Sequence, residues 1–366
     1  MNKKSPGPVM IMAGGTGGHV YPALAIADEL KQRGVAVIWL GTRKGIEARL
    51  VPEAGIEVDW LGMSGVRGKG AFTLLFAPLK IIIACSQAFK ILKKRRPSVV
   101  LGMGGFVSAP GGLMAALVRI PLLIHEQNAV PGMSNRLLAK IAWRVMEAFP
   151  GSFKHRQGKP SLHVGNPVRR EIFSLPAPEQ RWQGRSGALR ILVFGGSLGA
   201  ARLNEVVPQA CARIAENKPL TIRHQAGAGN FEQTKKNYAE LNLSVEVVEY
   251  MDDMAQMYAW ADLLICRAGA MTIAEIAAAG VASVLVPYPY AVDDHQTFNA
   301  RYLSDKKAAI LIKQDDMNVD ALVQILNGID RPQALDMSIR ARQLAMADST
   351  RLVSDACMLA GGYDVN

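Results

Sequence analysis

Short apolar runs alternate with amphipathic stretches along the chain, and several of the runs end at glycine. The first run, Val9–Ala13, continues into the loop GGTGG and then into an amphipathic helical pattern. A second start of this kind begins at Arg190, where Ile191–Phe194 leads into GGSLGA and the helical pattern Ala200–Ala215. Two strand–glycine–helix starts about half a chain apart predict two doubly wound, Rossmann-like α/β domains that face each other across a cleft.

Further short apolar runs favour buried parallel strands in both halves. In the first half they are Ala36–Leu40, Glu57–Leu61, Val99–Leu101 and Leu122–Ile124, and in the second half Leu220–His224, Val245–Val248, Leu263–Cys266 and Ser283–Val286. Helical patterns lie between them, such as Leu113–Arg119, and Met254–Trp260 after the N-cap candidates Asp252 and Asp253.

A domain boundary is predicted between Ser152 and Ser186, where the periodicity fades and prolines gather. We therefore expect an N-terminal domain at 1–163 and a C-terminal domain at 164–340. The remaining tail has a helical pattern over Ala341–Gly362.

The composition agrees with a large α/β protein and narrows its partners. The 366 residues are 49% hydrophobic and include 34 glycines, and a chain of this length usually needs two cores. Lys and Arg number 42 against 31 Asp and Glu, a formal net charge of +11 that favours nucleic acid, nucleotide or acidic lipid. The four widely spaced cysteines favour reduced core residues in a cytosolic protein, and no secretory signal is expected at the N-terminus.

The stretch Phe72–Arg96 combines apolar and basic residues. Pro78 and Lys80 interrupt it, so it falls short of the roughly 20 apolar residues that cross a bilayer. It is consistent with a surface lying on anionic lipid and equally with a core helix that has a basic end. The preceding glycine-rich loop, Gly62–Gly70, is either a basic lid or a solvated connection.

Glycine loops and polar strand exits mark candidate binding sites in the first half. The loop after Val9–Ala13 is expected to bring the amides of Gly14, Gly15, Gly17 and Gly18 close to an anion. A second loop, GMGGF, follows Val99–Leu101, and the run His125–Asn128 (HEQN) follows Leu122–Ile124. Exits of parallel strands face the ligand crevice in such folds, so substrate contact and a purely structural role are both open for HEQN.

The second half offers a nucleotide-like site. The turn RAGAMT after Leu263–Cys266 opens a helix whose first amides suit a pyrophosphate, and Glu275, one turn further, suits the diol of a ribose. Polar side chains crowd the exit of Ser283–Val286, a pattern that suits the hydroxyls of a sugar: Asp293, Asp294, His295, Gln296 and Asn299. Arg169 in GNPVR is either a phosphate clamp or an exposed linker residue.

The ordered set GGTGGH, GMGGF, HEQN, GNPVR, GGSLGA and CRAGAMTIAE resembles the MurG family, whose members convert lipid I to lipid II with UDP-N-acetylglucosamine. The resemblance spans most of the chain and implies a GT-B glycosyltransferase fold. It implies that the N-terminal domain takes the acceptor, lipid I (undecaprenyl-pyrophosphoryl-MurNAc-pentapeptide), and is joined by the C-terminal helix, 341–366. The C-terminal domain would bind UDP-N-acetylglucosamine.

The resemblance also implies roles for single residues. Thr16, Gly17, Gly18 and Asn128 would approach the sugar and diphosphate, Arg169 and Ser197 the phosphates, and Met251 the uracil. Ala270, Met271 and Thr272 at the helix start would cradle the pyrophosphate, and Ile273 and Ala274 would also belong to the substrate-binding site. Glu275 would bind the ribose, and Gln296 and Asn299 the N-acetylglucosamine. Three residues depart from the commoner family pattern: Phe106 in place of tyrosine, Leu198 in place of glutamine, and His295 where glutamine often precedes Gln296.

The implied reaction needs a base, a positioned anomeric carbon and stabilisation of departing UDP. We expect His19, at the edge of the first loop, to be the base, since an unperturbed histidine with a pKa of about 6.5 suits proton transfer near neutrality. Attack from the opposite side inverts the anomeric centre. Because the sequence has no D-x-D pair of the kind that holds a metal in other transferases, neither a metal nor a cofactor is expected. Peripheral attachment to anionic lipid at the cytoplasmic face of the inner membrane is expected through Phe72–Arg96.

Two other classes of protein share some of these sequence features. A dinucleotide oxidoreductase would share the first glycine loop, but Gly41–Lys44 offers no acidic residue for the ribose diol. A non-catalytic lipid- or nucleic-acid-binding protein would explain the charge but not two anion-binding turns. No nucleic-acid partner is therefore expected.

Overall fold

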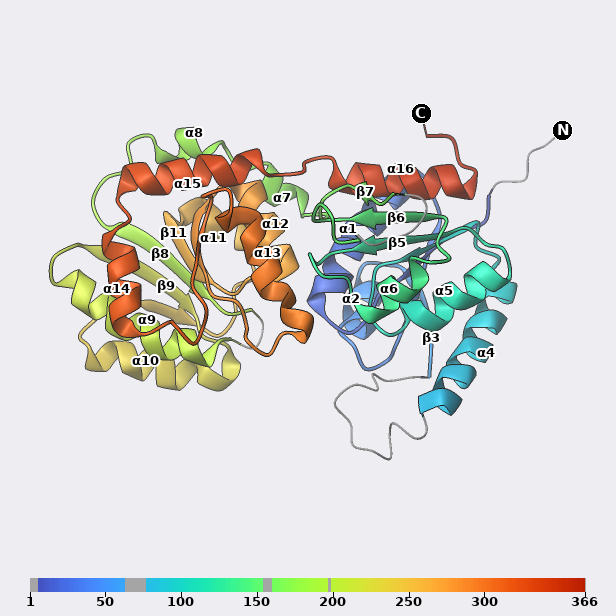
Figure 1. Ribbon diagram of the computed structural model, residues 1–366, viewed down its shortest axis with the longest axis horizontal. Helices are drawn as coiled ribbons and strands as arrows, with labels where there is room; N and C mark the ends of the chain where they lie inside the picture. Colours follow the sequence, from blue (N-terminus) through green and yellow to red (C-terminus); the bar gives the residue numbers. More distant parts are fainter. Residues whose placement is uncertain (1–5, 63–76, 154–159, 197–198, 366) are drawn as a thin grey trace. The chain divides into compact units, whose positions relative to one another are not determined.

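The computed structural model describes residues 6–62, 77–153, 160–196 and 199–365 (Figure 1). The chain forms two compact units. Unit 1 is Met1–Pro167 together with Asp348–Asn366, and unit 2 is Val168–Ala347. These boundaries lie four and seven residues beyond those expected from the sequence, and each unit is described by itself.

The described part of unit 1 contains a seven-stranded parallel sheet in the order β3-β2-β1-β4-β5-β6-β7. Its strands are β1 (Val9–Met12), β2 (Val37–Gly41), β3 (Glu57–Trp60), β4 (Val99–Gly102), β5 (Leu122–Glu126), β6 (Arg144–Glu147) and β7 (Leu162–His163). Its helices are α1 (Gly17–Gln32), α2 (Glu47–Glu53), α4 (Ala77–Arg95), α5 (Ser108–Leu117), α6 (Met133–Leu138) and α16 (Ser349–Gly361).

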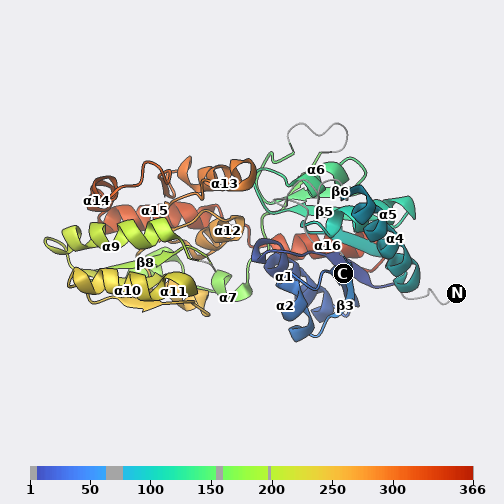
Figure 2. The same cartoon turned by 90° about the horizontal axis from the view of Figure 1, so that it is seen from below.

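Helices cover both faces of this sheet, which is why all four residues of β1 are apolar and buried. One core joins the sheet to α1 and to α16, including Val353, Cys357 and Met358. The other core joins it to α4, α5 and α6. Both views show α4 and α5 side by side (Figures 1 and 2).

The described part of unit 2 contains a six-stranded parallel sheet in the order β10-β9-β8-β11-β12-β13. Its strands are β8 (Leu189–Phe194), β9 (Leu220–Gln225), β10 (Glu246–Val248), β11 (Leu263–Cys266), β12 (Ala282–Leu285) and β13 (Ile310–Leu311). Its helices are α7 (Arg170–Phe173), α8 (Pro178–Trp182), α9 (Ala201–Ala215), α10 (Phe231–Glu240), α11 (Met254–Trp260), α12 (Ala270–Ala279), α13 (His295–Ser304), α14 (Val319–Asn327) and α15 (Arg331–Gln343), with 3₁₀ turns η1 (Ala228–Asn230) and η2 (Val292–Asp294).

The strand order reverses next to the first strand of each sheet, between β1 and β4 in unit 1 and between β8 and β11 in unit 2. In doubly wound sheets, ligands bind outside the carboxyl ends of the strands at such a point. Four glycine-containing loops follow these four strands, so in each unit the topology brings two of them together.

Helix α5 corrects the sequence interpretation. We expected a helix over Leu113–Arg119, but α5 begins at Ser108, because Gly111 and Gly112 act as packing positions rather than as a loop. A Cβ on Gly111 would lie 2.3 Å from the sulfur of Met12, and one on Gly112 would lie 2.8 Å from Leu138. The two glycines therefore let α5 lie close to the sheet and to α6.

The tail is a second correction. The pattern over Ala341–Gly362 predicted one helix, but α15 ends at Gln343 in unit 2 and α16 begins at Ser349 in unit 1. Strands β6, β7 and β13 were also missed, since β6 carries a charged residue at each end and the other two have only two residues each.

Candidate functional site

The first glycine loop of unit 1 rests on a buried carboxylate. Glu47, on α2, accepts hydrogen bonds from the Gly15 amide at 3.0 Å and from the amide and hydroxyl of Thr42 at 3.1 and 2.7 Å. The prediction that Gly15 offers a bare amide to an anion is therefore wrong. The loop continues through Thr16, the N-cap of α1, to Gly17 and Gly18 in its first turn.

The second glycine loop packs directly against the first. Gly104 and Gly105 have φ of +102° and +78°, a conformation that favours glycine. A Cβ on Gly105 would lie 2.4 Å from the Gly14 carbonyl oxygen, and a Cβ on Gly104 would lie 2.7 Å from the His19 ring. Both glycines are thus needed for the two loops, and the His19 ring, to lie this close.

The HEQN segment lies at the carboxyl end of β5, as expected, and its side chains have different partners. Gln127 lies 2.8 Å from the His19 ring, and the buried His125 ring lies 2.9 Å from the Gly165 carbonyl oxygen. Burial lowers the pKa of His125 to about 4. Glu126 accepts from the amide and side chain of Asn128 at 3.0 and 3.2 Å, so it holds the turn that carries Asn128.

In unit 2, the turn after β11 opens α12 with Gly269 as the N-cap. The first turn contains Ala270, Met271 and Thr272, carries no acidic residue, and directs backbone amides out of the helix start. The turn is followed by Ile273, which is buried, and Ala274, which is half-buried. This arrangement suits an anionic ligand, as the sequence predicted, because the helix dipole and the backbone amides of the helix start act together.

Glu275, one turn along α12, has two partners in this structure. Its carboxylate accepts from the Tyr258 hydroxyl at 3.0 Å and lies 3.4 Å from the Arg169 guanidinium. Burial raises the pKa of Glu275, although the nearby charge of Arg169 opposes that effect. Arg169, at the N-cap of α7, therefore points to the carboxylate that we expected to hold a ribose.

The polar residues after β12 divide into an accessible amide and a buried one. The side-chain oxygen of Gln296 accepts from the amides of Ala268 and Tyr288 at 3.2 and 2.9 Å, which places this side chain at the exits of both β11 and β12. Asn299 is completely buried, and its Nδ2 donates to the Ala268 carbonyl at 3.3 Å. Met251 is half-buried just before α11, where Asp253 accepts from the Gln256 amide as the predicted N-cap.

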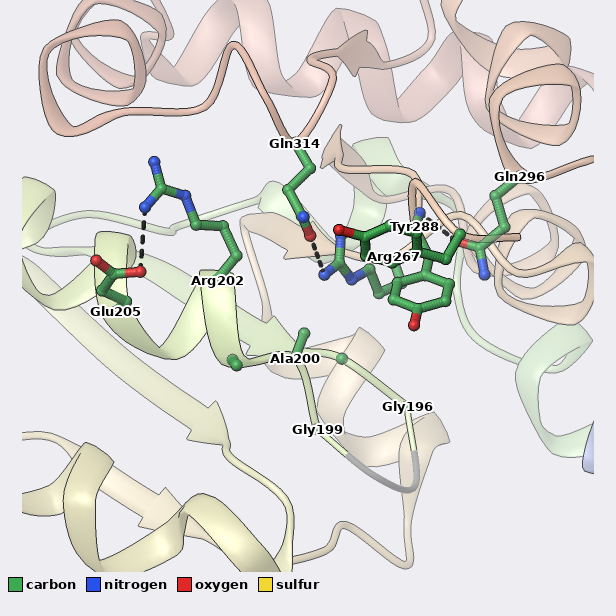
Figure 3. A pocket seen from close by; sticks show the side chains of 12 residues that line it. Gly196, Gly199, Ala200, Arg202, Glu205, Arg267, Tyr288, Gln296 and Gln314 are labelled. Carbon is green, nitrogen blue, oxygen red and sulfur yellow. Dashed lines mark hydrogen bonds and ion pairs between the residues drawn. The ribbon is translucent and has the colours of Figure 1, made fainter. Parts of the chain in front are cut away.

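A pocket of about 650 Å³ in unit 2 lies beside the third glycine loop. Its lining includes Gly195, Gly196, Gly199, Arg202, Glu205, Arg267, Tyr288, Tyr290, Gln296 and Gln314 (Figure 3). Gln296 is the one predicted site residue in this lining. Ser197 and Leu198 lie outside the described residues.

Arg267 is a pocket residue that the sequence reasoning missed. Its buried guanidinium donates to the carbonyls of Val286 and Pro287 at 3.2 Å and to Gln314 Oε1 at 2.6 Å, and lies 5.5 Å from the centre of the Tyr288 ring (Figure 3). Burial lowers its pKa. Within the described residues its hydrogen-bond acceptors are all neutral, which suits a pocket that receives an anion. The sequence feature that could have identified Arg267 is its position directly after the strand β11.

No group of three or more His, Cys, Asp or Glu side chains in residues 6–62, 77–153, 160–196 and 199–365 is arranged to hold a metal ion. In the same residues, no helix combines the length and the apolar character needed to cross a membrane.

Comparisons with known proteins cover both units. The model of the glycosyltransferase family 28 N-terminal domain matches residues 9–147, and that of the C-terminal domain matches residues 190–352. A UDP-N-acetylglucosamine–N-acetylmuramyl-(pentapeptide) pyrophosphoryl-undecaprenol N-acetylglucosamine transferase of Nitrosospira multiformis is 49% identical over 350 residues, 96% of this chain and 98% of the relative. The protein of that name from Thiobacillus denitrificans is 50% identical over 356 residues, 95% of this chain and 97% of the relative.

Solved structures agree with these matches. The crystal structure of Acinetobacter baumannii MurG is similar with a TM-score of 0.85 and 42% identity, covering 97% of this chain and 100% of that one. The glycotransferase of kitacinnamycin shares only 18% identity with a TM-score of 0.71, covering 98% of this chain and 100% of that one, and so supports the fold alone.

Proposed function

The chain belongs to glycosyltransferase family 28, with the GT-B fold of its structural neighbours, and we infer that it transfers N-acetylglucosamine from UDP-N-acetylglucosamine to lipid I, forming lipid II in peptidoglycan synthesis. The observation that carries this inference is the 49% identity over 96% of the chain, which spans both units. The family resemblance read from the sequence motifs is thereby confirmed.

We propose that unit 2 binds the donor at the carboxyl ends of β8 and β11. The first amides of α12, with Thr272 adding a hydroxyl, receive the diphosphate, and Glu275 accepts hydrogen bonds from the ribose hydroxyls. Met251 meets the uracil through its backbone, and the amide of Gln296 meets the N-acetylglucosamine. Ser197 is proposed to contact the phosphates from the third glycine loop.

Asn299 is assigned a supporting role in this proposal. Because its side chain is completely buried and bonded to the Ala268 carbonyl, it acts on the sugar by holding the turn that Gln296 also binds. Arg169 releases Glu275 to the ribose and turns to the phosphates, a short movement for a side chain that is 42% exposed.

We propose that unit 1 takes the acceptor, that its Thr16, Gly17, Gly18 and Asn128 approach the sugar and diphosphate of the donor, and that His19 is the base. As the muramyl 4-hydroxyl oxygen forms a bond to the anomeric carbon, its proton moves to Nε2 of His19. The bond from that carbon to the β-phosphate oxygen breaks, UDP leaves with the electron pair, and the configuration inverts to a β1,4 linkage. The helix start at Thr272 and Arg169 stabilise the departing charge.

Attachment to the membrane is proposed through a surface of unit 1 that we call the apolar–basic patch. Its exposed apolar side chains are Leu79, Ile81, Ile82, Ile83 and Phe89 on α4, Leu113 and Leu117 on α5, and Met133, Leu137, Ile141 and Trp143 on and after α6. The same helices and the segments that follow them carry Lys80, Lys90, Lys93, Lys94, Arg119, Arg136, Lys140 and Arg144. The start of the predicted stretch Phe72–Arg96, up to Phe76, and all but the first residue of the Gly62–Gly70 loop lie outside the described residues.

This combination favours anionic lipid, because apolar side chains enter the boundary of the acyl chains while cations meet the head groups. The sequence was equally consistent with a core helix, and α4 combines a core face with a surface face. Ala84, Ala88 and Leu92 are buried, whereas Leu79–Ile83 are exposed. We propose peripheral attachment at the cytoplasmic face of the inner membrane, where the acceptor lipid would be met.

The test is transfer of labelled N-acetylglucosamine from its UDP form to a lipid I analogue, with chelator present and UDP-glucose as the competing donor. We expect transfer that survives the chelator and prefers the acetamido sugar. Tight UDP binding without transfer would reject the acceptor, and loss of transfer with chelator would reject the metal-free reaction. The base assignment is tested separately, since near-normal turnover of His19→Ala would reject it.

A further inference from the structure

A chain of hydrogen bonds in unit 1 runs from a backbone carbonyl to the proposed base. It begins at His125 on β5, whose Nε2 lies 2.9 Å from the Gly165 carbonyl oxygen. A carbonyl oxygen can only accept, so Nε2 carries the hydrogen. Because burial lowers the pKa of His125 to about 4, its ring is neutral near pH 7 and its Nδ1 is an acceptor.

Gln127 is the next group in this series of hydrogen bonds. Its Nε2 lies 3.0 Å from His125 Nδ1 and 3.1 Å from the His125 carbonyl oxygen. Both neighbours are acceptors, so the two amide hydrogens are used, and a flipped amide would place its oxygen against two lone pairs. The side-chain oxygen therefore faces His19.

His19 is the last group in this series of hydrogen bonds. Its Nδ1 lies 2.8 Å from Gln127 Oε1, an atom that only accepts, so Nδ1 carries a hydrogen. When His19 is neutral, its lone pair is then on Nε2, the reverse of the tautomer that dominates for histidine in water. The close approach of Gly104 holds the ring in this orientation.

We propose that Gln127 and His125 are positioning residues that hold neutral His19 as the Nδ1–H tautomer, with Nε2 bare to accept the proton of the acceptor hydroxyl. This inference rests on the proposed function, because it concerns the tautomer in which His19 can act as the base of that reaction. Once Nε2 is protonated, the dipole of the Gln127 carbonyl also stabilises the imidazolium, because the Nδ1–H···Oε1 bond strengthens with the charge.

The test compares Gln127→Met, which has similar volume but no hydrogen-bonding group, with Gln127→Glu, in which one carboxylate oxygen accepts from Nδ1–H while the other has no hydrogen to donate to His125. The chain has six histidines, so ¹⁵N-histidine labelling and long-range ¹H–¹⁵N spectra can report the tautomer of His19, identified by its absence in His19→Ala. Gln32→Met is the matched control, because Gln32 is an exposed residue of α1, the helix that carries His19.

We expect wild type, Gln32→Met and Gln127→Glu to show the Nδ1–H form, and Gln127→Met to show mainly Nε2–H. Turnover of Gln127→Met should fall about 100-fold, the usual contribution of a general base, with UDP affinity unchanged and partial recovery in Gln127→Glu. An unchanged tautomer or unchanged turnover in Gln127→Met overturns the proposal.

Failure of the function itself has a different signature. If His19→Ala keeps turnover, or if wild type makes no transfer, the base or the reaction is wrong, whatever the spectra show. If His19→Ala is inactive and Gln127→Met changes the tautomer without loss of turnover, only the positioning role is wrong. If Gln127→Met does not fold, Gln127→Glu decides alone, because an Nε2–H form in that variant contradicts the proposal.

Discussion

The carboxylate of Glu47 lies beneath the first glycine loop and accepts a hydrogen bond of 3.0 Å from the Gly15 amide, 32 residues away along the chain. Since its other partners, the amide and hydroxyl of Thr42, are donors too, an ionised carboxylate satisfies all three. The loop is thus held by the protein's own negative charge. An anion placed at the same amide would meet both a used donor and electrostatic repulsion.

Replacing this carboxylate should loosen the loop. In Glu47→Gln, the side-chain NH₂ group replaces one of the two accepting oxygens and faces a donor of Gly15 or Thr42. The lost hydrogen bond should lower the unfolding free energy of unit 1 by about 2 kcal/mol. Urea unfolding and deuterium uptake of the peptide spanning residues 9–21 measure the effect. Glu53→Gln, an exposed position on the same helix, is the control, and equal uptake in the two variants would contradict the role of Glu47.

Tyr258 should influence donor affinity although it is buried. Its hydroxyl donates to Glu275 at 3.0 Å, so Tyr258→Phe removes a hydrogen bond that orients the carboxylate proposed to bind the ribose. A loss of about 1 kcal/mol, or roughly fivefold in the dissociation constant for UDP, is expected by titration calorimetry. Tyr238→Phe, which instead loses a bond to His224, should bind UDP normally. Wild-type affinity in Tyr258→Phe would remove Tyr258 from the donor site.

Two buried histidines should make the protein less stable in mild acid. Burial lowers the pKa of His125 in unit 1 to about 4 and of His224 in unit 2 to about 3, whereas both return to about 6.5 on unfolding. Between those values the unfolded chain binds more protons, so stability falls as pH falls. For His224 the loss from pH 7 to pH 5 is about 2 kcal/mol.

Urea unfolding at several pH values measures this dependence. His224→Gln should remove the contribution of His224 and leave that of His125. An identical slope in wild type and His224→Gln would show that His224 is not neutral in the folded protein.

Binding to vesicles should depend on the apolar–basic patch. Ile82 and Leu117 are 64% and 69% exposed, and the double variant Ile82→Glu, Leu117→Glu adds two charges where apolar contact with lipid is proposed. Co-sedimentation with anionic vesicles should weaken at least about tenfold. Leu359→Glu, at a leucine of α16 that is 61% exposed, should bind as wild type. Equal binding of both variants would place the contact elsewhere.

Local pattern predicted much of the fold because parallel strands buried on both faces have a strong apolar signal. The runs that became β1, β4, β8 and β11 were found within one or two residues, and so were the helix starts after β1, β8 and β11, whereas α5 begins five residues before the expected helix. Strands of two residues, such as β13, carry too little pattern to be found.

The candidate site was less accessible to sequence reasoning, since its contacts join distant parts of the chain. Gln127 stood in a motif whose role was left open, but its function depends on a carbonyl at Gly165 and a ring at His19. The burial of Asn299 likewise follows from the packing of α13 on the turn at Ala268. Residue type predicted polarity at these positions, and tertiary structure decided which side chains face a ligand.

Helix α16 constrains the order in which the two units can complete their folding during synthesis. Its residues Val353, Cys357 and Met358 complete a core of unit 1, yet the ribosome makes them only after all of Val168–Ala347. Unit 2 can fold as soon as its own residues emerge, while unit 1 waits with the surface of α1 and β4 uncovered. A chain truncated before Ser349 would keep every glycine loop and still leave the domain that came first unfinished.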